Sequence, residues 1–203
     1  MQLFTYPIIK ESYGGYGCLF VEIRWHGRGG QGIVTVSRLL ASAALLDGKY
    51  AQAFPEFGPE RRGAPVTGYT RISDEPIVIH SQIYNPNIVV VVDPTLIGRV
   101  DVTKGLTPKG LIVAHSEKDP EELRKDLGVS DAKVYTVNAM RIALDILGRP
   151  IYNTAMLGAL LRVTPLAKME SLFKVVTERF PGTIGEKNIA VIKRAYEEVQ
   201  GIE

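Results

Sequence analysis

The sequence predicts an α/β fold in which helices flank a mostly parallel β-sheet and an antiparallel hairpin is added to it. Segments with the pattern of strands alternate with segments with the pattern of helices, an order typical of parallel sheets covered by helices. Residues 88–92 form a continuous β-branched run, as expected of a central strand that is buried on both faces. A cluster of glycines at residues 27–32 joins a predicted strand to a predicted helix.

The first half of the chain is predicted to contain one helix among several strands. A Gly-rich turn at residues 13–17 makes residues 1–20 an irregular arm, and residues 21–203 are expected to form a single domain. Turn residues at 73–76 are expected to join two strands into the hairpin. The elements expected here are a strand at 20–25, a buried helix at 33–46 closed by Asp47 and Gly48, and strands at 50–54, 66–72 and 77–81.

The second half changes from alternating strands and helices to helices alone. Residues 120–127 have two glutamates in their first turn and are followed by Gly128, a placement of charge and glycine that favours a helix. Gly- and Pro-rich breaks separate the later helices. The elements expected here are strands at 88–92, 111–114 and 133–137 and helices at 120–127, 138–147, 154–162, 168–180 and 186–199.

The composition is that of a globular protein without an unusual charge balance. Of 203 residues, 45% are hydrophobic and 23% are charged, and the formal net charge is +2. The longest run of basic residues is the pair Arg61-Arg62, which argues against a nucleic-acid-binding surface. Apolar runs are far shorter than the ~20 residues of a membrane span, and residues 1–20 lack the apolar core of a signal peptide. We therefore expect a cytoplasmic protein that binds neither nucleic acid nor membranes.

The chain has one cysteine, Cys18. One thiol cannot form an internal disulfide, a cysteine-based zinc site or a four-cysteine iron–sulfur site. The histidines His26, His80 and His115 show no spacing typical of metal ligands. The sequence also contains no Ser/His/Asp or Cys/His arrangement and no pair of carboxylates that indicates catalysis. We therefore expect neither a metal site nor a catalytic residue on this chain.

The candidate binding motif is Gly27-x-Gly29-x-x-Gly32, between the predicted strand and the predicted helix. Glycines there let the backbone turn tightly and approach a diphosphate, and the free N–H groups at the helix start attract anions. Arg28 and Gln31 place a cation and an amide inside the turn. The candidate ligand-binding residues are therefore Gly27, Arg28, Gly29, Gly30, Gln31 and Gly32, and His26 is either a further polar contact or a structural histidine. The alternative is a tight turn that binds nothing.

A nicotinamide dinucleotide is disfavoured as the ligand of this Rossmann-like turn. Its fingerprint needs an acid about 20 residues beyond the glycines, at the end of the second strand. Residues 50–54 contain no acid, whereas Asp47 comes too early and Glu56 too late. Gly30 beside Gly29 also departs from the usual fingerprint.

Residues 54–65 form a second candidate, a loop rich in Pro, Gly and charge. Its adjacent arginines, Arg61 and Arg62, suit a phosphate or a carboxylate because each guanidinium can donate two parallel hydrogen bonds. The loop follows the second strand, so we expect it at the same edge of the sheet as the glycine turn. Its alternative role is a surface or interface loop in which the arginines pair with Glu56 and Glu60.

Asp93 follows the apolar run at 88–92 and has two candidate roles. It could face the crevice outside the carboxyl ends of the strands, where ligands of α/β sheets bind. The dipeptide Asp93-Pro94 is also a common way to stop a strand and begin a turn, and this is the role that we favour. Asn153-Thr154 is expected to cap a helix, and residues 185–188 are expected to form the turn that enters the last helix.

Three segments in this order resemble the gamma subunits of the 2-oxoacid:ferredoxin oxidoreductase family, most closely those of the pyruvate enzymes. They are His-Gly-Arg-Gly-Gly-Gln-Gly at residues 26–32, Phe-Gly-Pro-Glu-Arg-Arg-Gly-Ala-Pro-Val at 57–66, and Asp93-Pro94 after the valine run. The resemblance covers about residues 21–200. It implies a subunit of a complex that oxidatively decarboxylates pyruvate with coenzyme A to acetyl-CoA and CO₂, reduces ferredoxin and can run in reverse.

The resemblance also implies how the cofactors are divided among subunits. Thiamine diphosphate and Mg²⁺ belong to other subunits and [4Fe-4S] clusters to a ferredoxin-like subunit, so the implied partners are alpha, beta and delta subunits, with ferredoxin as acceptor. The gamma-type chain packs against the thiamine-binding subunits and helps to form the coenzyme A site. The glycine turn and the Arg61-Arg62 loop are then the expected contacts with coenzyme A. The residues agree with this division, because the chain lacks both the cluster cysteines and the Gly-Asp-Gly…Asn pattern of a thiamine diphosphate site.

Other functions stay open from the sequence. The chain could serve an enzyme for branched-chain or other 2-oxoacids, since the residues that select the acyl group are expected on other subunits. It could instead be a stand-alone nucleotide- or coenzyme A-binding module, or a structural scaffold whose glycine turn is empty.

Overall fold

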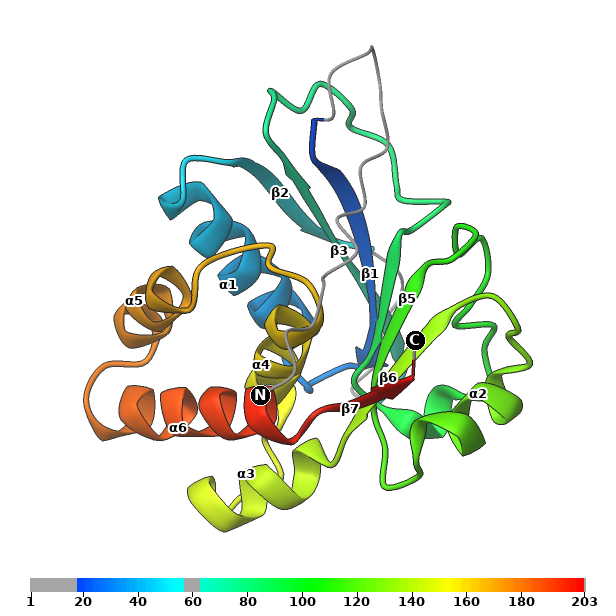
Figure 1. Cartoon of the computed structure of the whole chain (residues 1–203). Helices are drawn as coiled ribbons and strands as arrows, with labels where there is room; N and C mark the ends of the chain where they lie inside the picture. The colour runs from blue at the N-terminus through cyan, green and yellow to red at the C-terminus, as the bar shows by residue number, and fades with distance from the viewer. Residues whose placement is uncertain (1–17, 57–62, 203) are drawn as a thin grey trace.

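The computed structural model describes residues 18–56 and 63–202, and within these ranges the predicted alternation of strands and helices is confirmed (Figure 1). Most elements lie within a few residues of their predicted bounds. In chain order they are β1 (Phe20–Arg28), α1 (Ile33–Leu46), β2 (Tyr50–Pro55), β3 (Pro65–Ser73), β4 (Ile88–Val91), the 3-10 helix η1 (Pro94–Leu96), β5 (Leu111–His115), α2 (Pro120–Leu127), β6 (Lys133–Val137), α3 (Ala139–Leu147), α4 (Asn153–Val163), α5 (Met169–Arg179), α6 (Thr183–Glu198) and β7 (Gln200–Ile202).

The strands of the described residues form one seven-stranded sheet in the order β2-β3-β1-β4-β5-β6-β7. β1, β4, β5 and β6 are parallel to one another. β3 is antiparallel to both of its neighbours, β1 and β2, so β2 points the same way as β1. β7 is antiparallel to β6. Only β3 and β7 therefore run against the others, and the prediction of a mostly parallel sheet is confirmed.

The antiparallel hairpin lies elsewhere than predicted. It is formed by β2 and β3, whereas residues 77–81, the expected second strand, have no strand conformation. Residues 68–73 of β3 have no free edge for this segment, because they pair with β1 on one side and with β2 on the other. Arg71 on β3 is only 1% exposed and donates hydrogen bonds to the carbonyl oxygens of Ile79 and Ser81, which hold the segment beside the sheet. β7 is a further strand that the sequence did not predict.

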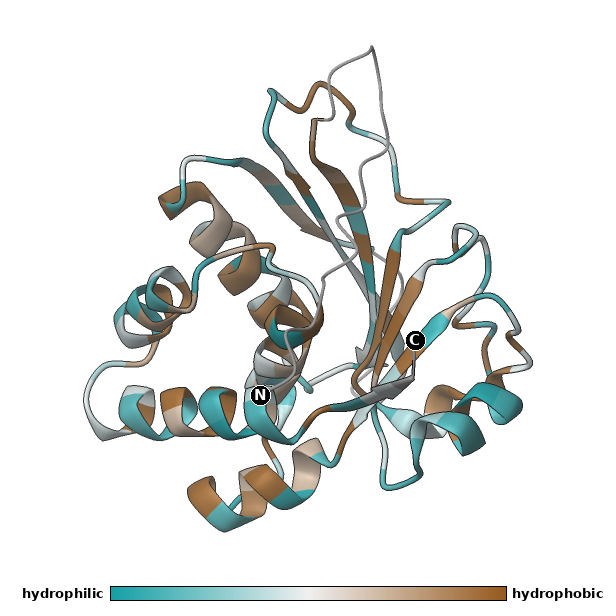
Figure 2. Ribbon diagram, viewed as in Figure 1, coloured by the Kyte–Doolittle hydropathy of each residue, from teal (hydrophilic) through white to brown (hydrophobic). Residues whose placement is uncertain are grey.

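Helices cover the two faces of the sheet unequally. In Figure 1, α1, α4, α5 and α6 gather on one side, and α2 lies on the other. The central strand β4 contacts both layers: Ile88 and Val90 belong to the core under α1 and α4, and Val89 and Val91 to the core that includes Leu123 of α2. All four residues of β4 have no exposed surface, which explains the unbroken β-branched run. Figure 2 shows the same pattern as brown central strands inside helices with teal outer faces.

The polar face of β1 is covered by irregular segments. Glu22, Arg24 and His26 alternate with the apolar residues of the strand, which pack in the core under α1. Arg24 is 7% exposed and donates a hydrogen bond of 3.1 Å to the carbonyl of Val102, in the segment between η1 and β5. Loops rather than helices therefore bury this face of the sheet beside β4.

Candidate functional site

The turn at the glycine motif begins later than the sequence indicated. β1 continues through Gly27 and Arg28, and Arg28 pairs with Pro65 of β3. The turn itself consists of residues 29–32. Gly30 and Gly32 have φ values of 95° and 73°, a left-handed backbone that glycine adopts without strain. Gly32 is the N-cap of α1, and its carbonyl accepts the first helical hydrogen bond, from Val36.

Gly27 is required for packing between β1 and α1. A Cβ atom at this position would lie 2.3 Å from Cδ1 of Ile33, the first residue of the helix. Gly29 has a different role, since its N–H donates to the carbonyl of Ala64 at 2.8 Å and its carbonyl accepts from Gly63 at 3.1 Å. The motif therefore fixes both the helix and the end of the 54–65 loop against the sheet.

The loop at residues 54–65, which contains Arg61 and Arg62, begins and ends at the edge of the sheet where the glycine turn lies, as expected. Its C-terminal end binds Gly29 through the two backbone hydrogen bonds above, and at its other end the Glu56 N–H donates to the Thr67 carbonyl. The Glu56 carboxylate accepts a 2.8 Å hydrogen bond from the Tyr69 hydroxyl, and burial together with this bond raises the pKa of Tyr69. Arg61 and Arg62 lie outside the described residues, so their contact with a ligand stays a prediction.

Arg28 and Gln31, the cation and amide of the turn, both contact Asp93. The Arg28 guanidinium lies 3.2 Å from Asp93 Oδ2 and donates to Thr95 Oγ1, and Gln31 Nε2 donates to the same Asp93 oxygen at 2.6 Å. Gln31 Oε1 also accepts from the backbone N–H of Arg28 at 2.7 Å. These contacts hold the turn in shape. Binding of a phosphate by the two side chains stays a prediction.

Asp93 combines the two roles considered for it. Its Oδ1 accepts from the N–H and hydroxyl of Thr95 and so caps η1, while its Oδ2 holds Gln31 and Arg28. Burial acts to raise the pKa of Asp93, but hydrogen bonds from Thr95 and Gln31 and the charge of Arg28 outweigh it and lower the pKa. The carboxylate is therefore ionised and links the end of β4 to the glycine turn.

His26 does not face the turn. Its ring lies on the polar face of β1, where Nε2 accepts a 3.0 Å hydrogen bond from Arg24 Nε. Burial, followed by the charge of Arg24, lowers the pKa of His26 to about 4. His26 is thus a buried neutral histidine, the structural alternative of the sequence analysis.

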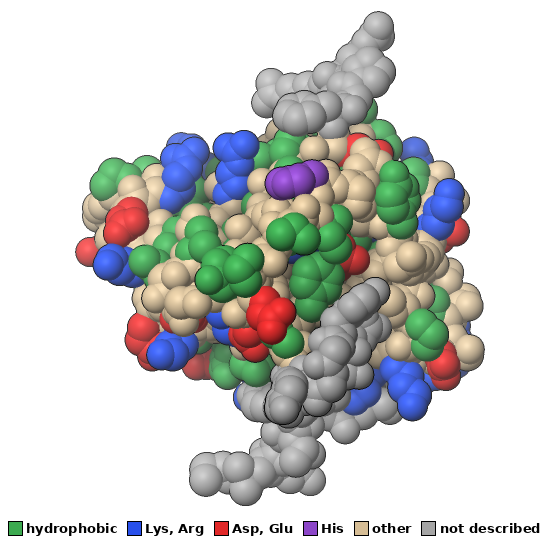
Figure 3. Space-filling model, turned by 90° about the horizontal axis from the view of Figure 1, so that it is seen from above, with side chains coloured by type: hydrophobic (Ala, Val, Ile, Leu, Met, Phe, Trp, Pro, Cys, Tyr) green, Lys and Arg blue, Asp and Glu red, His purple; other side chains and the backbone are tan. Residues whose placement is uncertain are grey.

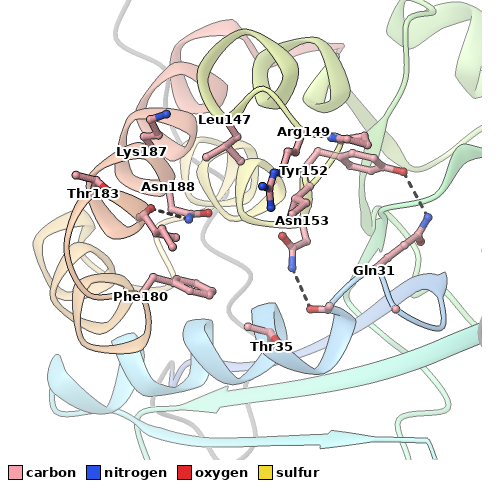
Figure 4. A pocket seen from close by; sticks show the side chains of 15 residues that line it. Gln31, Thr35, Leu147, Arg149, Tyr152, Asn153, Phe180, Thr183, Lys187 and Asn188 are labelled. Atoms are coloured by element: carbon pink, nitrogen blue, oxygen red, sulfur yellow. Dashed lines mark hydrogen bonds between the residues drawn. The ribbon is translucent and has the colours of Figure 1, made fainter.

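A pocket of about 570 Å³ opens beside the turn (Figure 4). Three parts of the chain line it: the turn with the start of α1, the segment from the end of α3 to the start of α4, and the segment from the end of α5 into α6. The lining residues are Gly30, Gln31, Gly32, Thr35, Leu147, Arg149, Pro150, Ile151, Tyr152, Asn153, Phe180, Thr183, Ile184, Lys187 and Asn188. The predicted residues Gly30, Gln31 and Gly32 are thereby brought together with groups from the C-terminal third.

Asn153 joins the turn to α4. The sequence suggested a helix cap, but α4 starts at Asn153 with Tyr152 as its N-cap. The Asn153 amide instead donates to the carbonyl of Gly32 at 3.3 Å, and a Cβ on Gly32 would lie 2.2 Å from its nitrogen. Gly32 is therefore a glycine both for its backbone conformation and for contact with α4.

Tyr152 lines the pocket and contacts Gln31, the residue that binds the Asp93 carboxylate. Its hydroxyl accepts from Gln31 Nε2 at 3.5 Å, and its ring lies 4.7 Å from that of His115. Burial, followed by the charge of Asp93, raises the pKa of Tyr152, and burial lowers the pKa of His115. Both groups are therefore neutral at neutral pH.

Two cations of the pocket, Arg149 and Lys187, were not predicted from the sequence. Arg149 stood in a Gly-Arg-Pro break between helices, and Lys187 in a segment read as a turn but located inside α6. Their only local signal was a basic residue next to a helix boundary, which does not reveal what the side chain faces.

Two general findings apply to the parts of the chain that the structure describes. No group of three or more His, Cys, Asp or Glu side chains lies close enough together to hold a metal ion. No helix in these ranges is both long and apolar enough to span a membrane.

Comparison with known proteins identifies relatives along almost the whole chain. The model of the family described as pyruvate ferredoxin/flavodoxin oxidoreductase matches residues 22–198. The pyruvate/ketoisovalerate oxidoreductases common subunit gamma of Pyrococcus furiosus is 51% identical over 183 residues, which cover 90% of this chain and 99% of the relative. Pyruvate synthase subunit PorC of Methanothermobacter thermautotrophicus is 52% identical over 180 residues, 89% of this chain and 96% of the relative. The crystal structure of pyruvate oxidoreductase subunit PORC from Thermotoga maritima has a TM-score of 0.82 at 42% identity and covers 91% of this chain and 99% of that one.

Proposed function

The chain belongs to the pyruvate ferredoxin/flavodoxin oxidoreductase family, and we propose that it is the gamma subunit of a pyruvate:ferredoxin oxidoreductase, or pyruvate synthase. The complex would convert pyruvate and coenzyme A to acetyl-CoA and CO₂ with ferredoxin as electron acceptor, in a reversible reaction. Relatives of nearly the same length are named as subunits of such enzymes, and the chain covers 99% of one and 96% of another. These relatives support the assignment as a gamma subunit.

The chain is proposed to act without redox groups of its own. Its single cysteine does not fit the four thiolates of a [4Fe-4S] cluster. Electron transfer and decarboxylation would therefore use thiamine diphosphate, Mg²⁺ and clusters held by alpha, beta and delta subunits. What this chain contributes is a binding surface.

The contribution that we propose is part of the coenzyme A site. The observation that carries it is the pocket of about 570 Å³ beside Gly30 and Gly32, at the carboxyl end of β1. Ligands of open α/β sheets bind at this edge, and the volume suits a cofactor-sized group. The glycine turn and the Arg61-Arg62 loop would border the ligand.

Packing on the thiamine-binding subunits is assigned to the segment between β3 and β4. Val78, Ile79 and Tyr84 of this segment are 80%, 44% and 67% exposed. Hydrophobic side chains gather near the centre of the face that Figure 3 shows. Arg71 holds the segment in place through the carbonyl of Ser81 at 2.7 Å. A surface that is both apolar and held in one conformation is suited to a protein partner.

The test is an anaerobic pull-down of the tagged chain from its own organism, with partner masses, bound thiamine diphosphate and iron measured. Copurification with a thiamine diphosphate subunit and an iron–sulfur subunit, and coenzyme A-dependent dye reduction, are the expected result. Assays with pyruvate and branched-chain 2-oxoacids then identify the substrate, including the case of one subunit shared by two enzymes. Recovery of the chain alone and without iron would overturn the proposal in favour of a stand-alone coenzyme A-binding module.

A variant checks the packing surface separately. Val78→Asp with Tyr84→Asp is expected to prevent copurification while the chain stays folded, because both side chains are exposed. The matched control is Leu45→Asp, which alters another exposed apolar residue, 53% exposed on α1. If the double variant still recovers every partner, the subunits pack on a different face.

A further inference from the structure

We propose that Arg149 and Lys187 bind the phosphate groups of the ligand in the pocket, and that Arg28 of the glycine motif does not. The ligand class is a phosphorylated molecule that also has an apolar part. The pocket and its two cations are features of the structure whatever the function. Only the identification of the ligand as coenzyme A rests on the proposed function.

The two cations come from different elements and face one cavity. Arg149 lies in the connection between α3 and α4, and Lys187 lies in α6. Figure 4 shows the Arg149 side chain directed between Asn188 and Asn153, with Lys187 at the α6 side of the pocket. A fork of guanidinium donors and a mobile ammonium suit a phosphate or diphosphate.

Neither cation has a counter-ion among the residues that the structure describes. The salt bridges found in these ranges involve other basic residues, for example Arg28 with Asp93, Arg71 with Glu22, and Arg194 with Asp145. The described lining residues of the pocket include no Asp or Glu. The cavity therefore has an excess of positive charge that an anionic ligand would neutralise.

The helix starts add backbone donors on the same side. α1 and α6 have glycine N-caps, Gly32 and Gly182, and neither has a side-chain cap. Helix starts without such a cap leave N–H groups unsatisfied and add positive potential. Gly32 and Thr183, the first residue of α6, both line the cavity. These donors supplement the two cations.

Part of the remaining wall is apolar, which indicates more than a free phosphate as ligand. Ile151 and Ile184 line the cavity and are 52% and 60% exposed. Leu147 and Phe180 line it as well. A pocket with apolar walls and few charged groups is typical of an organic ligand oriented by its polar end.

Arg28 is unsuited to this role because each of the three nitrogens of its guanidinium already has an acceptor in the protein. Its guanidinium contacts the Asp93 carboxylate, Thr95 Oγ1 and the Gly63 carbonyl. Arg28 is also absent from the lining of the pocket. Its charge is compensated, whereas those of Arg149 and Lys187 are not.

The experiment measures steady-state kinetics of the assembled complex with Arg149→Met or Lys187→Met in this chain. Each variant is expected to raise KM for coenzyme A about tenfold, as for the loss of one charge-assisted hydrogen bond, with kcat and KM for pyruvate unchanged. Lys125→Met on α2, an exposed cation on the other side of the sheet, is the matched control and should leave all three values unchanged. Dephospho-coenzyme A as substrate separates the two kinds of phosphate: a smaller effect of a variant with it assigns that cation to the 3′-phosphate, an equal effect to the diphosphate.

The inference and the proposed function can fail separately. An unchanged KM for coenzyme A in both variants of an active complex overturns the inference and leaves the function intact. If the complex or its activity does not exist, calorimetry of the full chain with inorganic pyrophosphate tests the pocket directly. Weaker binding by Arg149→Met than by Lys125→Met then supports the pocket, and equal or absent binding overturns it.

Discussion

Gln31 and Asp93, which are 62 residues apart in the sequence, are joined by a 2.6 Å hydrogen bond from Nε2 to Oδ2. The same carboxylate oxygen lies 3.2 Å from Arg28 Nε. Asp93, at the end of β4, thus neutralises Arg28 and accepts a hydrogen bond from Gln31 of the glycine turn. The turn keeps its shape through these contacts, and the pocket beside it takes its positive charge from other residues.

Removal of this carboxylate should loosen the turn. Asp93→Ala leaves the Gln31 amide and the Thr95 N–H without their acceptor and Arg28 without its counter-ion, so we expect a loss of about 2–3 kcal/mol in unfolding free energy. Denaturant unfolding of the full chain measures this loss. Asp126→Asn is the matched control, because its pair with Lys118 is exposed and should change stability by less than about 1 kcal/mol. A loss no larger than that of the control would show that Asp93 does not support the turn.

Gly27 should tolerate a side chain only if Ile33 becomes smaller. Gly27→Ala places a methyl group 2.3 Å from Ile33 Cδ1, and we expect a loss of about 1–3 kcal/mol from overpacking. Ile33→Ala removes both Cδ1 and Cγ1, which would lie 2.3 and 2.7 Å from that methyl group, and costs about 2–5 kcal/mol alone. The double variant should be more stable than the sum of the single losses predicts, as a double-mutant cycle would measure. Strict additivity would contradict the proposed contact.

Arg71 should determine whether the segment between β3 and β4 stays in place. Arg71→Met leaves Glu22, to which Arg71 Nε donates at 2.7 Å, and the Ser81 carbonyl without their buried partner. We expect a loss of about 3 kcal/mol and faster thermolysin cleavage within residues 77–82. Arg141→Met, which breaks an exposed pair with Glu198, is the control and should leave the cleavage rate unchanged. Equal cleavage rates in the two variants would rule out this role.

The buried His26 should make the protein less stable in acid. Its pKa is lowered from 6.5 to about 4 in the folded state, so the unfolded chain binds the proton more tightly. The contribution to stability is complete above pH 6.5 and is lost as the pH falls from 6.5 towards 4. His26→Gln should reduce the slope of unfolding free energy against pH in this window by up to about 1.4 kcal/mol per pH unit. Part of the slope should persist, because burial also lowers the pKa of His115.

His80→Gln is the control for this measurement. His80 lies in the exposed segment between β3 and β4. Its replacement makes the same chemical change as His26→Gln at an exposed position. If His26→Gln has no greater effect than His80→Gln, the acid sensitivity has another origin.

Elements with local signals were predicted well from the sequence. α2 occupies its predicted residues because Asp119 accepts a hydrogen bond from the Glu122 N–H at its start, and Gly128 ends it with a φ of 64°. β4 was identified from its β-branched run, which requires burial on both faces. Such signals act within one turn or one strand, so they are present in the sequence itself.

Which strands pair with each other could not be predicted from the local sequence pattern. Ile77, Val78 and Ile79 form a β-branched run typical of a strand, yet this segment does not pair with β3, and its Ile79 and Ser81 carbonyls accept hydrogen bonds from Arg71. β3 instead pairs with β2 and β1. A strand pattern specifies which face is apolar, but the partner depends on side chains elsewhere in the chain.

The sequence by itself determined the α/β class, the glycine turn with its helix and the family resemblance, because each depends on residues adjacent in the chain. Only the tertiary structure decided that Asp93 pairs with Arg28 and that Arg149 and Lys187 line the same pocket as Gly32. The physical reason is that charge compensation depends on distance in space. A cation that faces a cavity and one that is paired with a distant carboxylate have the same local sequence signal.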